Sequence, residues 1–202
     1  MNNYSTERGD KMRILGIVGI AIFYASYFWK LLQQKRRGIQ TNQLGKGNKG
    51  KKTVMIEMLL RYSSVLVVGA MLISVLWNTS MVPNVVVRLI GIIIFYIGIG
   101  FFIIAMYTMK DSWRAGIPSE DQTQIVTSGI YRVSRNPAFL GFDLTYIGIS
   151  IAFGNSPLIV LSVITIILMH LQILEEEKYL EFAFGDSYIQ YKNKAGRYFV
   201  FF

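Results

Sequence analysis

The feature that most constrains this chain is a set of long stretches without a charged residue. Residues 14–29, 62–87 and 89–109 contain no Asp, Glu, Lys or Arg. Residues 144–174 also lack all four and contain one histidine, His170. A helix needs about 20 residues to cross the roughly 30 Å hydrocarbon core of a bilayer. Together with a hydrophobic content of 52%, the pattern predicts a membrane protein rather than a soluble domain.

We expect an all-α integral membrane protein with about five transmembrane helices and a C-terminal amphipathic cytoplasmic helix. The predicted spans are 14–32, 62–82, 89–109, 137–153 and 157–174. The last two are short and joined by "GNSP", which predicts a tight helical hairpin. A cleaved signal peptide is the alternative for the first span, but no small-residue cleavage site follows it, and "KRR" is typical of a stop-transfer signal.

The distribution of basic residues predicts the orientation of these helices. Seventeen of the 21 Lys and Arg residues lie on one side of the five-span arrangement and four on the other. The positive-inside rule therefore places the C-terminus in the cytoplasm and the N-terminus outside. The net charge of +9 is explained by topology and by anionic membrane lipids, so nucleic acid is not expected as a partner.

We expect one structural domain with two parts. Residues 1–110 form a three-helix membrane scaffold with a basic loop at 35–52, and residues 111–202 contain a cofactor-binding loop, the helical hairpin and the C-terminal helix. The basic loop contains "GKGNKG", but a dinucleotide site needs a strand before the glycines, so we interpret the loop as a flexible, solvated linker. The chain has no cysteine, and we predict no metal site.

The stretch "TSGIYRVSRNPAFLG" places charge directly before an apolar helix. Asn136 and Pro137 are favoured residues for the N-cap and first position of a helix. Free backbone N–H groups at this start, beside Arg132 and Arg135, predict an anion site. The alternative is a capped membrane helix whose arginines extend to lipid phosphates. The residues alone leave both interpretations open.

A few polar side chains lie inside or at the end of the last two predicted spans. Asp143 lies one to two turns inside the fourth span, where an ionisable group is a functional candidate or pairs with an arginine. Gln172 and Glu176 are four residues apart and share one helix face near His170. For His170 and the acidic cluster, an interfacial histidine and a solvated helix end are the alternatives.

Two blocks of sequence, "GIYRVSRNPAFLG" and "EEKYLEFAFGDSYIQY", together resemble the isoprenylcysteine carboxyl methyltransferase and phospholipid methyltransferase superfamily. Members of that superfamily show G-x-Y-x-x-x-R-H-P-x-Y-x-G, a helical hairpin, and then E-E-x-x-L with F-G-x-x-Y-x-x-Y. The resemblance covers roughly residues 111–199. The matching residues are Gly129, Tyr131, Arg135, Pro137, Gly141, Glu176, Glu177, Leu180, Phe184, Gly185, Tyr188 and Tyr191.

The resemblance implies a membrane-embedded methyltransferase that uses S-adenosylmethionine and acts on a lipophilic small molecule or a lipidated substrate. Glu176 and His170 are the candidate catalytic residues, and Asp143, Gln172 and Arg197 are candidates for binding the substrate. The expected cofactor-binding residues are Gln124, Ile125, Val126, Tyr131, Arg135, Asn136, Pro137, Ala138, Phe139 and Glu176.

This sequence also departs from the superfamily pattern. Asn136 replaces the usual His, Phe139 replaces the usual Tyr, and Gln172 stands where eukaryotic prenylcysteine enzymes have a substrate-binding arginine. "AGR" replaces V-P-R near Arg197. These changes weaken the case for a prenylcysteine carboxylate as the substrate. Two alternatives remain: an NADPH-dependent membrane reductase of the steroid-reductase type, and a non-enzymatic membrane scaffold.

Overall fold

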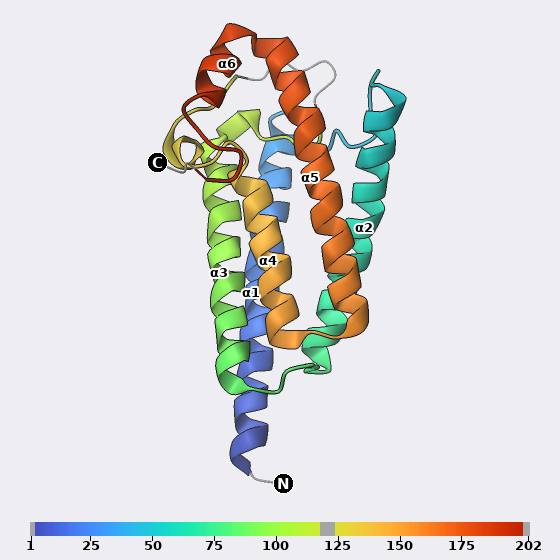
Figure 1. Cartoon of the computed structure of the whole chain (residues 1–202), viewed down its shortest axis with the longest axis vertical. Helices are drawn as coiled ribbons and strands as arrows, with labels where there is room; N and C mark the ends of the chain where they lie inside the picture. Colours follow the sequence, from blue (N-terminus) through green and yellow to red (C-terminus); the bar gives the residue numbers. More distant parts are fainter. Residues whose placement is uncertain (1–2, 118–123, 200–202) are drawn as a thin grey trace.

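The computed structural model describes residues 3–117 and 124–199, and these form a bundle of long helices (Figure 1). Within that part of the chain the only extended pairing is a single parallel bridge between Asn42 and Ala115. The helices are α1 (Asn3–Arg36), α2 (Lys51–Leu76), α3 (Val85–Thr108), α4 (Pro137–Phe153), α5 (Ser156–Phe184) and α6 (Asp186–Lys192), with short 3-10 turns η1 (Lys110–Ser112) and η2 (Gly129–Arg132).

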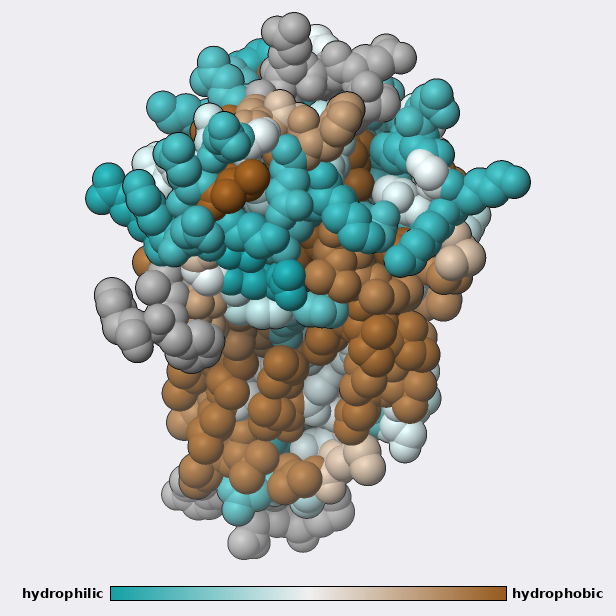
Figure 2. Space-filling view, turned by 45° about the horizontal axis from the view of Figure 1, so that its top comes forward, coloured by the Kyte–Doolittle hydropathy of each residue, from teal (hydrophilic) through white to brown (hydrophobic). Residues whose placement is uncertain are grey.

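Four of these helices are long and apolar enough to cross a membrane: Gly9–Arg36, Lys51–Leu76, Val85–Thr108 and Ser156–Phe184. The fifth predicted span is α4, a shorter apolar helix of 17 residues. Figure 2 shows a hydrophobic surface along the bundle and hydrophilic side chains gathered at the end that carries the loops. This is the architecture of a multi-pass integral membrane protein, and it confirms the predicted fold class.

Helices α3 and α4 pack along each other through glycines. A Cβ atom added to Gly98 would lie 2.6 Å from the backbone nitrogen of Thr145, and one added to Gly141 would lie 2.6 Å from the backbone nitrogen of Phe102. Such contacts are too short for any side chain, so glycine at these positions lets the two backbones approach closely. Gly69 of α2 and Gly100 of α3 have no such role, because no atom lies within 4 Å of an added Cβ at either position.

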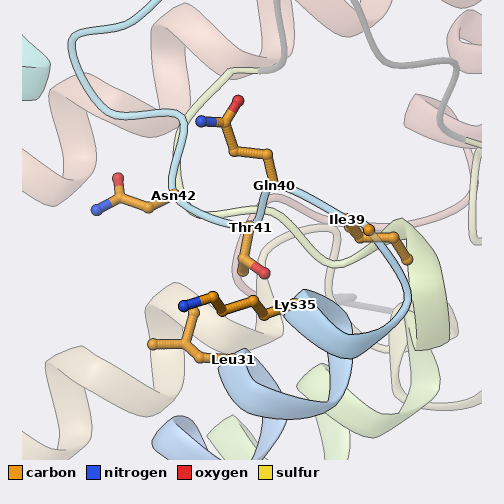
Figure 3. A pocket seen from close by; sticks show the side chains of 7 residues that line it. Leu31, Lys35, Ile39, Gln40, Thr41 and Asn42 are labelled. Carbon is orange, nitrogen blue, oxygen red and sulfur yellow. The ribbon is translucent and has the colours of Figure 1, made fainter.

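The segment between α1 and α2 is folded, which corrects the prediction of a flexible, solvated linker. Thr41 is buried and its hydroxyl donates a hydrogen bond of 2.6 Å to Gln34 of α1. Figure 3 shows the turn itself, with Thr41 above Leu31 and Lys35 on the last turns of α1. Beyond the turn, Gln43 is buried and accepts a hydrogen bond from Lys49 through its carbonyl oxygen. The buried polar residues of this segment therefore form hydrogen bonds with protein groups.

The C-terminal region contains two helical pieces where one amphipathic helix was predicted. Helix α5 continues past the apolar span to Phe184, and Gly185 then adopts a φ of 52° before α6 begins at Asp186. A positive φ of this size is strained for residues other than glycine, so Gly185 sets the break. The aromatic residues Tyr188 and Tyr191 of α6 are buried against the rest of the protein, while Phe182 is exposed.

Candidate functional site

A cavity of about 550 Å³ lies at the end of the bundle that carries the loops and α6 (Figure 1). Its walls come from α1, α2, α4, α5 and α6, and its remaining lining residues belong to the segments 42–44, 109–117, 124–126 and 131–136 between the helices. The predicted site residues that line it are Gln124, Ile125, Val126, Tyr131, Arg135, Asn136, Ala138, Phe139, Gln172 and Glu176. The two motif blocks, separated by about 35 residues, therefore contribute to one cavity.

The two motif blocks also contact each other directly through an ionic cluster. Arg135 donates a hydrogen bond of 2.9 Å to Glu177, and Arg197 donates one of 2.8 Å to the other oxygen of the same carboxylate. The hydrogen bond with Glu177 raises the pKa of Arg197. Arg135 also donates to the backbone carbonyl of Lys192. The charge of Arg135 is therefore already paired, although its side chain borders the cavity.

Asn136 occupies the N-cap position of α4, but its side chain makes no capping hydrogen bond. Its amide instead donates to Glu177 at 3.4 Å and to the carbonyl oxygen of Arg197 at 3.2 Å. Because Pro137 has no N–H group, the first turn of α4 presents the N–H groups of Ala138 and Phe139 without a side-chain cap. Both residues line the cavity, so the backbone N–H groups at the start of α4 remain available as hydrogen-bond donors to an anion.

Tyrosines of η2 and α6 form another part of the cavity lining at this end of the bundle. The hydroxyl of Tyr191 donates a hydrogen bond of 2.6 Å to the carbonyl oxygen of Tyr131. Burial, with smaller contributions from Tyr191 and Glu176, raises the pKa of Tyr131. Burial first and Glu177 second raise the pKa of Tyr188 to about 12. Burial also raises the pKa of Tyr191, so all three phenols are neutral near pH 7.

On α5, Gln172 and Glu176 form the polar face that the sequence predicted. The Nε2 atom of Gln172 donates a hydrogen bond of 3.1 Å to Oε1 of Glu176. The same nitrogen lies 3.4 Å from Oε1 of Glu57 on α2. Gln172 is 1% exposed and lines the cavity beside Glu176. A carboxylate, a carboxamide and a second carboxylate thus form a continuous polar chain in the wall.

Glu57 is a buried carboxylate that sequence reasoning missed. It accepts hydrogen bonds from the backbone of Gly45 at 2.7 Å and of Ile117 at 3.1 Å, and Lys49 forms an ion pair with it at 2.7 Å. Glu57 therefore joins α2 to the two loops that line the cavity. The sequence did contain a signal for it: a single glutamate near the start of α2. An acidic residue in a membrane helix is usually paired with a buried partner.

Trp113 is a second residue that the sequence did not single out. It is 6% exposed, lines the cavity, and its indole Nε1 has no hydrogen-bond partner among the described residues. The Oε1 atom of Gln172 is likewise buried without a partner. Buried polar atoms are normally hydrogen-bonded in native proteins. A donor and an acceptor left unpaired in the lining of one cavity indicate a polar ligand.

Two of the first three helices, α1 and α2, also line the cavity. Tyr24 and Tyr27 of α1 line the cavity, and so do Ser64 and Val65 of α2. Val65 is 67% exposed, so the cavity reaches the surface beside α2. This part of the lining is aromatic or aliphatic apart from Arg61 and a few hydroxyl groups. It offers an apolar passage that continues from the polar end into the membrane-spanning region.

Four of the predicted site residues do not line the cavity. Pro137 is buried at the first position of α4, where it sets the start of the helix. Nδ1 of His170 lies 2.7 Å from the hydroxyl of Tyr198. Burial first, and then the carboxylate of Asp143, raise the pKa of Tyr198, so these three residues form a separate group. Arg197 is engaged by Glu177.

Comparison with known proteins identifies the family of this chain. Residues 86–187 match the family model described as phospholipid methyltransferase. The chain belongs to the phospholipid methyltransferase family. The matched region begins in α3 and ends in α6, and it includes the first motif block and the second as far as Ser187. Membership was expected from the resemblance of these blocks, and it is confirmed.

Two relatives in this family are named protein-S-isoprenylcysteine O-methyltransferase. The protein from Saccharomyces cerevisiae is 35% identical over 97 residues, which cover 46% of this chain and 40% of the relative. The protein from Schizosaccharomyces pombe is 36% identical over 72 residues, which cover 35% of this chain and 30% of the relative. The similarity thus spans less than half the length of either relative.

Proposed function

We propose that this protein transfers a methyl group from S-adenosylmethionine to a lipophilic acceptor at the membrane. One observation carries the proposal: the two motif blocks of a methyltransferase family line a single cavity that contains a buried, unpaired donor on Trp113 and acceptor on Gln172. A volume of about 550 Å³ lies within the range of small-molecule and cofactor sites. The relatives act, by their names, on an isoprenylcysteine, which is a lipidated group.

The chemistry of the lining fits the functional groups of S-adenosylmethionine. Its carboxylate would receive the uncapped N–H groups of Ala138 and Phe139, where the positive end of the α4 dipole also favours an anion. Its ammonium and ribose hydroxyls would donate to Glu176, which has Gln172 as its only hydrogen-bond partner within the described chain. The backbone of residues 124–126 and the ring of Tyr131 would complete the pocket.

When bound, S-adenosylmethionine supplies an electrophilic methyl carbon whose bond to sulfur breaks with the electron pair left on sulfur. The protein's task is then alignment, because an in-line displacement needs the reacting atoms about 3 to 3.5 Å apart. The helices around the cavity exclude water from the reacting groups. An acceptor that loses a proton needs a base, and Glu176 is the carboxylate of the cavity that lacks a cationic partner.

The acceptor's apolar chain would occupy the passage lined by Tyr24, Tyr27 and Val65. Because the cavity reaches the surface beside α2, the chain would enter from the lipid without crossing water. Entry would then lie at α1 and α2. The excess of basic residues on this side of the bundle supports a cytoplasmic position for the reacting end and for the C-terminus.

Ligand binding to the purified protein in detergent tests this proposal. Titration with S-adenosylhomocysteine, the product that retains the amino-acid and ribose groups, should give saturable binding with one site. Titration with NADPH tests the reductase alternative and should give no binding. Binding of NADPH alone would indicate a reductase. Binding of neither ligand would indicate a scaffold, and either result would overturn the proposal.

A further inference from the structure

A second hollow, of about 440 Å³, lies at the end of α1 beside the turn that follows this helix (Figure 3). It is lined by Leu31 and Lys35 of α1 and by residues 38–42 of the turn. Of these residues, only Asn42 also lines the large cavity. The hollow is therefore a separate site that shares one residue with the cavity, and the proposed methyl transfer does not use it.

The charged group of this hollow is the ammonium of Lys35. Lys35 is exposed and forms no hydrogen bond or ion pair with any residue that the structure describes. Its neighbour Arg37, by contrast, forms an ion pair of 2.8 Å with Asp111. Residues 30–52 contain eight Lys and Arg residues and no Asp or Glu, so this segment supplies no carboxylate that could neutralise Lys35. The hollow therefore favours an anionic ligand.

The side chain of Asn42 adds uncharged donors to the same hollow. Its Oδ1 atom accepts a hydrogen bond of 3.2 Å from the backbone N–H of Leu44, which leaves the N–H₂ group of this amide without a partner among the described residues. Figure 3 shows the Lys35 ammonium and the Asn42 amide extending to the same side of the turn. Both groups are hydrogen-bond donors, and phosphate oxygens are acceptors that form strong hydrogen bonds with charged donors.

The level of the hollow relative to the bilayer indicates a lipid as the source of the phosphate. The membrane-spanning part of α1 ends at Arg36, so Lys35 lies in its last turn, where lipid headgroups are found. A basic segment next to a membrane span attracts anionic lipids. Leu31 lies one turn deeper, and Ile39 adds a second aliphatic side chain to the lining. The apolar part of a lipid can contact these two side chains, whereas inorganic phosphate cannot.

The turn that forms the hollow is also bonded to the segment that carries Trp113. The carbonyl oxygen of Thr41 accepts a hydrogen bond of 2.9 Å from the N–H of Ala115, and the N–H of Gln43 donates one of 2.8 Å to the carbonyl oxygen of Ala115. Trp113 and Ala115 line the large cavity. A ligand that holds the turn against α1 therefore also holds this wall of the cavity.

We propose that the hollow binds the phosphate group of an anionic phospholipid through Lys35, and that the bound lipid stabilises the adjoining wall of the large cavity. The phosphate oxygens accept hydrogen bonds from Lys35 and Asn42, and the apolar part of the lipid lies against Leu31. The lipid is a bound partner and not the methyl acceptor, because the hollow lies outside the cavity. Neither the site nor the stabilisation depends on methyl transfer.

Lipid binding to the full-length protein in a neutral detergent tests the site. Native mass spectrometry measures the dissociation constants of phosphatidylglycerol and phosphatidylcholine with identical acyl chains. We expect phosphatidylglycerol to bind at least about tenfold more tightly, because it carries a net negative charge and phosphatidylcholine does not. Inorganic phosphate at the same concentration should not displace it. Equal affinities for the two lipids would overturn the proposal, and so would displacement by inorganic phosphate, which would indicate a site for a free anion.

Substitutions assign the preference to the hollow. Lys35→Met should weaken binding of phosphatidylglycerol about tenfold and leave phosphatidylcholine within about twofold of its value. Asn42→Asp keeps an oxygen for the N–H of Leu44 and places a negative charge beside the phosphate, so it should also abolish the preference. Lys46→Met is the matched control, because it removes the same charge from an exposed position of this basic segment outside the hollow. Equal losses for Lys35→Met and Lys46→Met would show diffuse attraction, and the proposal would be wrong.

Hydrogen exchange of the amides of Gln43 and Ala115, which bond the turn to the cavity wall, measures the stabilisation. With phosphatidylglycerol at about ten times its dissociation constant, exchange should slow about tenfold, because the lipid binds the closed form. Phosphatidylglycerol should leave exchange in Lys35→Met unchanged. Unaltered exchange in the wild type with the lipid bound would reject the stabilisation. A failure to bind S-adenosylhomocysteine would reject the methyltransferase, and it would leave both lipid results standing.

Discussion

Arg135 and Glu177 form an ion pair of 2.9 Å that joins the segment before α4 to the C-terminal half of α5. The side chains are 8% and 6% exposed, so the pair is largely removed from water. Arg197 from the C-terminal segment binds the same carboxylate at 2.8 Å. One carboxylate therefore holds two guanidinium groups from segments that are far apart in the sequence, and it fixes one end of the candidate cavity.

Glu177→Gln should destabilise the protein strongly, because it leaves the buried guanidinium of Arg135 without a counter-charge. Removing one partner of a buried pair costs about 3 to 5 kcal/mol. The effect is measured as the change in melting temperature in detergent, monitored by size-exclusion chromatography after heating. Glu181→Gln is the control: its pair with Lys192 is about 40% exposed, and an exposed pair contributes at most about 1 kcal/mol. Equal melting temperatures for the two variants would contradict this account.

The association of the two motif blocks could be predicted from the sequence, but the partner of Arg135 could not. The blocks match a family pattern, and their order around a helical hairpin brings them to one end of the bundle. Arg135 was expected to receive the carboxylate of a ligand, and it binds Glu177 instead. The choice between these partners depends on the rotation of α5 about its axis. That rotation is set by packing against α2, and no local sequence signal reports it.

The same limit explains why the loop after α1 was misjudged. Residues 35–52 have the Gly, Lys and Asn content of a solvated linker, and composition is the only local signal there. The contacts that order the segment reach other elements: Thr41 binds Gln34, and Lys49 binds Glu57. By contrast, the apolar helices were predicted because hydrophobic length marks a membrane-spanning segment, although α2 covers Lys51–Leu76 where the prediction gave 62–82.

Gly98→Ala should reduce the yield of folded protein. The added methyl group would lie 2.6 Å from the backbone nitrogen of Thr145 on α4, so α3 and α4 would have to separate. Gly100→Ala lies on the same helix with no atom within 4 Å of its Cβ, and it should be neutral or slightly stabilising. The fraction of each variant that elutes as a monodisperse peak after purification measures the difference. A well-folded Gly98→Ala variant would show that α3 and α4 pack less closely than described.

Glu176→Gln should weaken binding of S-adenosylhomocysteine about tenfold, because a neutral amide replaces the charged acceptor for the ligand's ammonium. Glu175→Gln provides a control on the neighbouring residue, whose carboxylate binds Thr53 and Lys178 and is not part of the cavity lining. Isothermal titration of both variants compares the dissociation constants. An unchanged affinity for Glu176→Gln would remove this residue from the binding site.

Lys49→Met should both loosen the loop at residues 40–50, which borders the cavity, and weaken ligand binding. It leaves the buried carboxylate of Glu57 without its cation, a loss of about 3 to 5 kcal/mol for a buried pair. The loop then opens more readily, because the hydrogen bonds from Gly45 and Ile117 to Glu57 form only when the loops are closed.

Hydrogen exchange of the amides in residues 40–50 should accelerate in Lys49→Met and stay unchanged in Lys46→Met, which alters an exposed lysine of the same loop. Saturating S-adenosylhomocysteine should restore part of the protection, since a ligand that binds the closed form stabilises it. Equal exchange in both variants would show that the Lys49–Glu57 pair does not hold the loop in place.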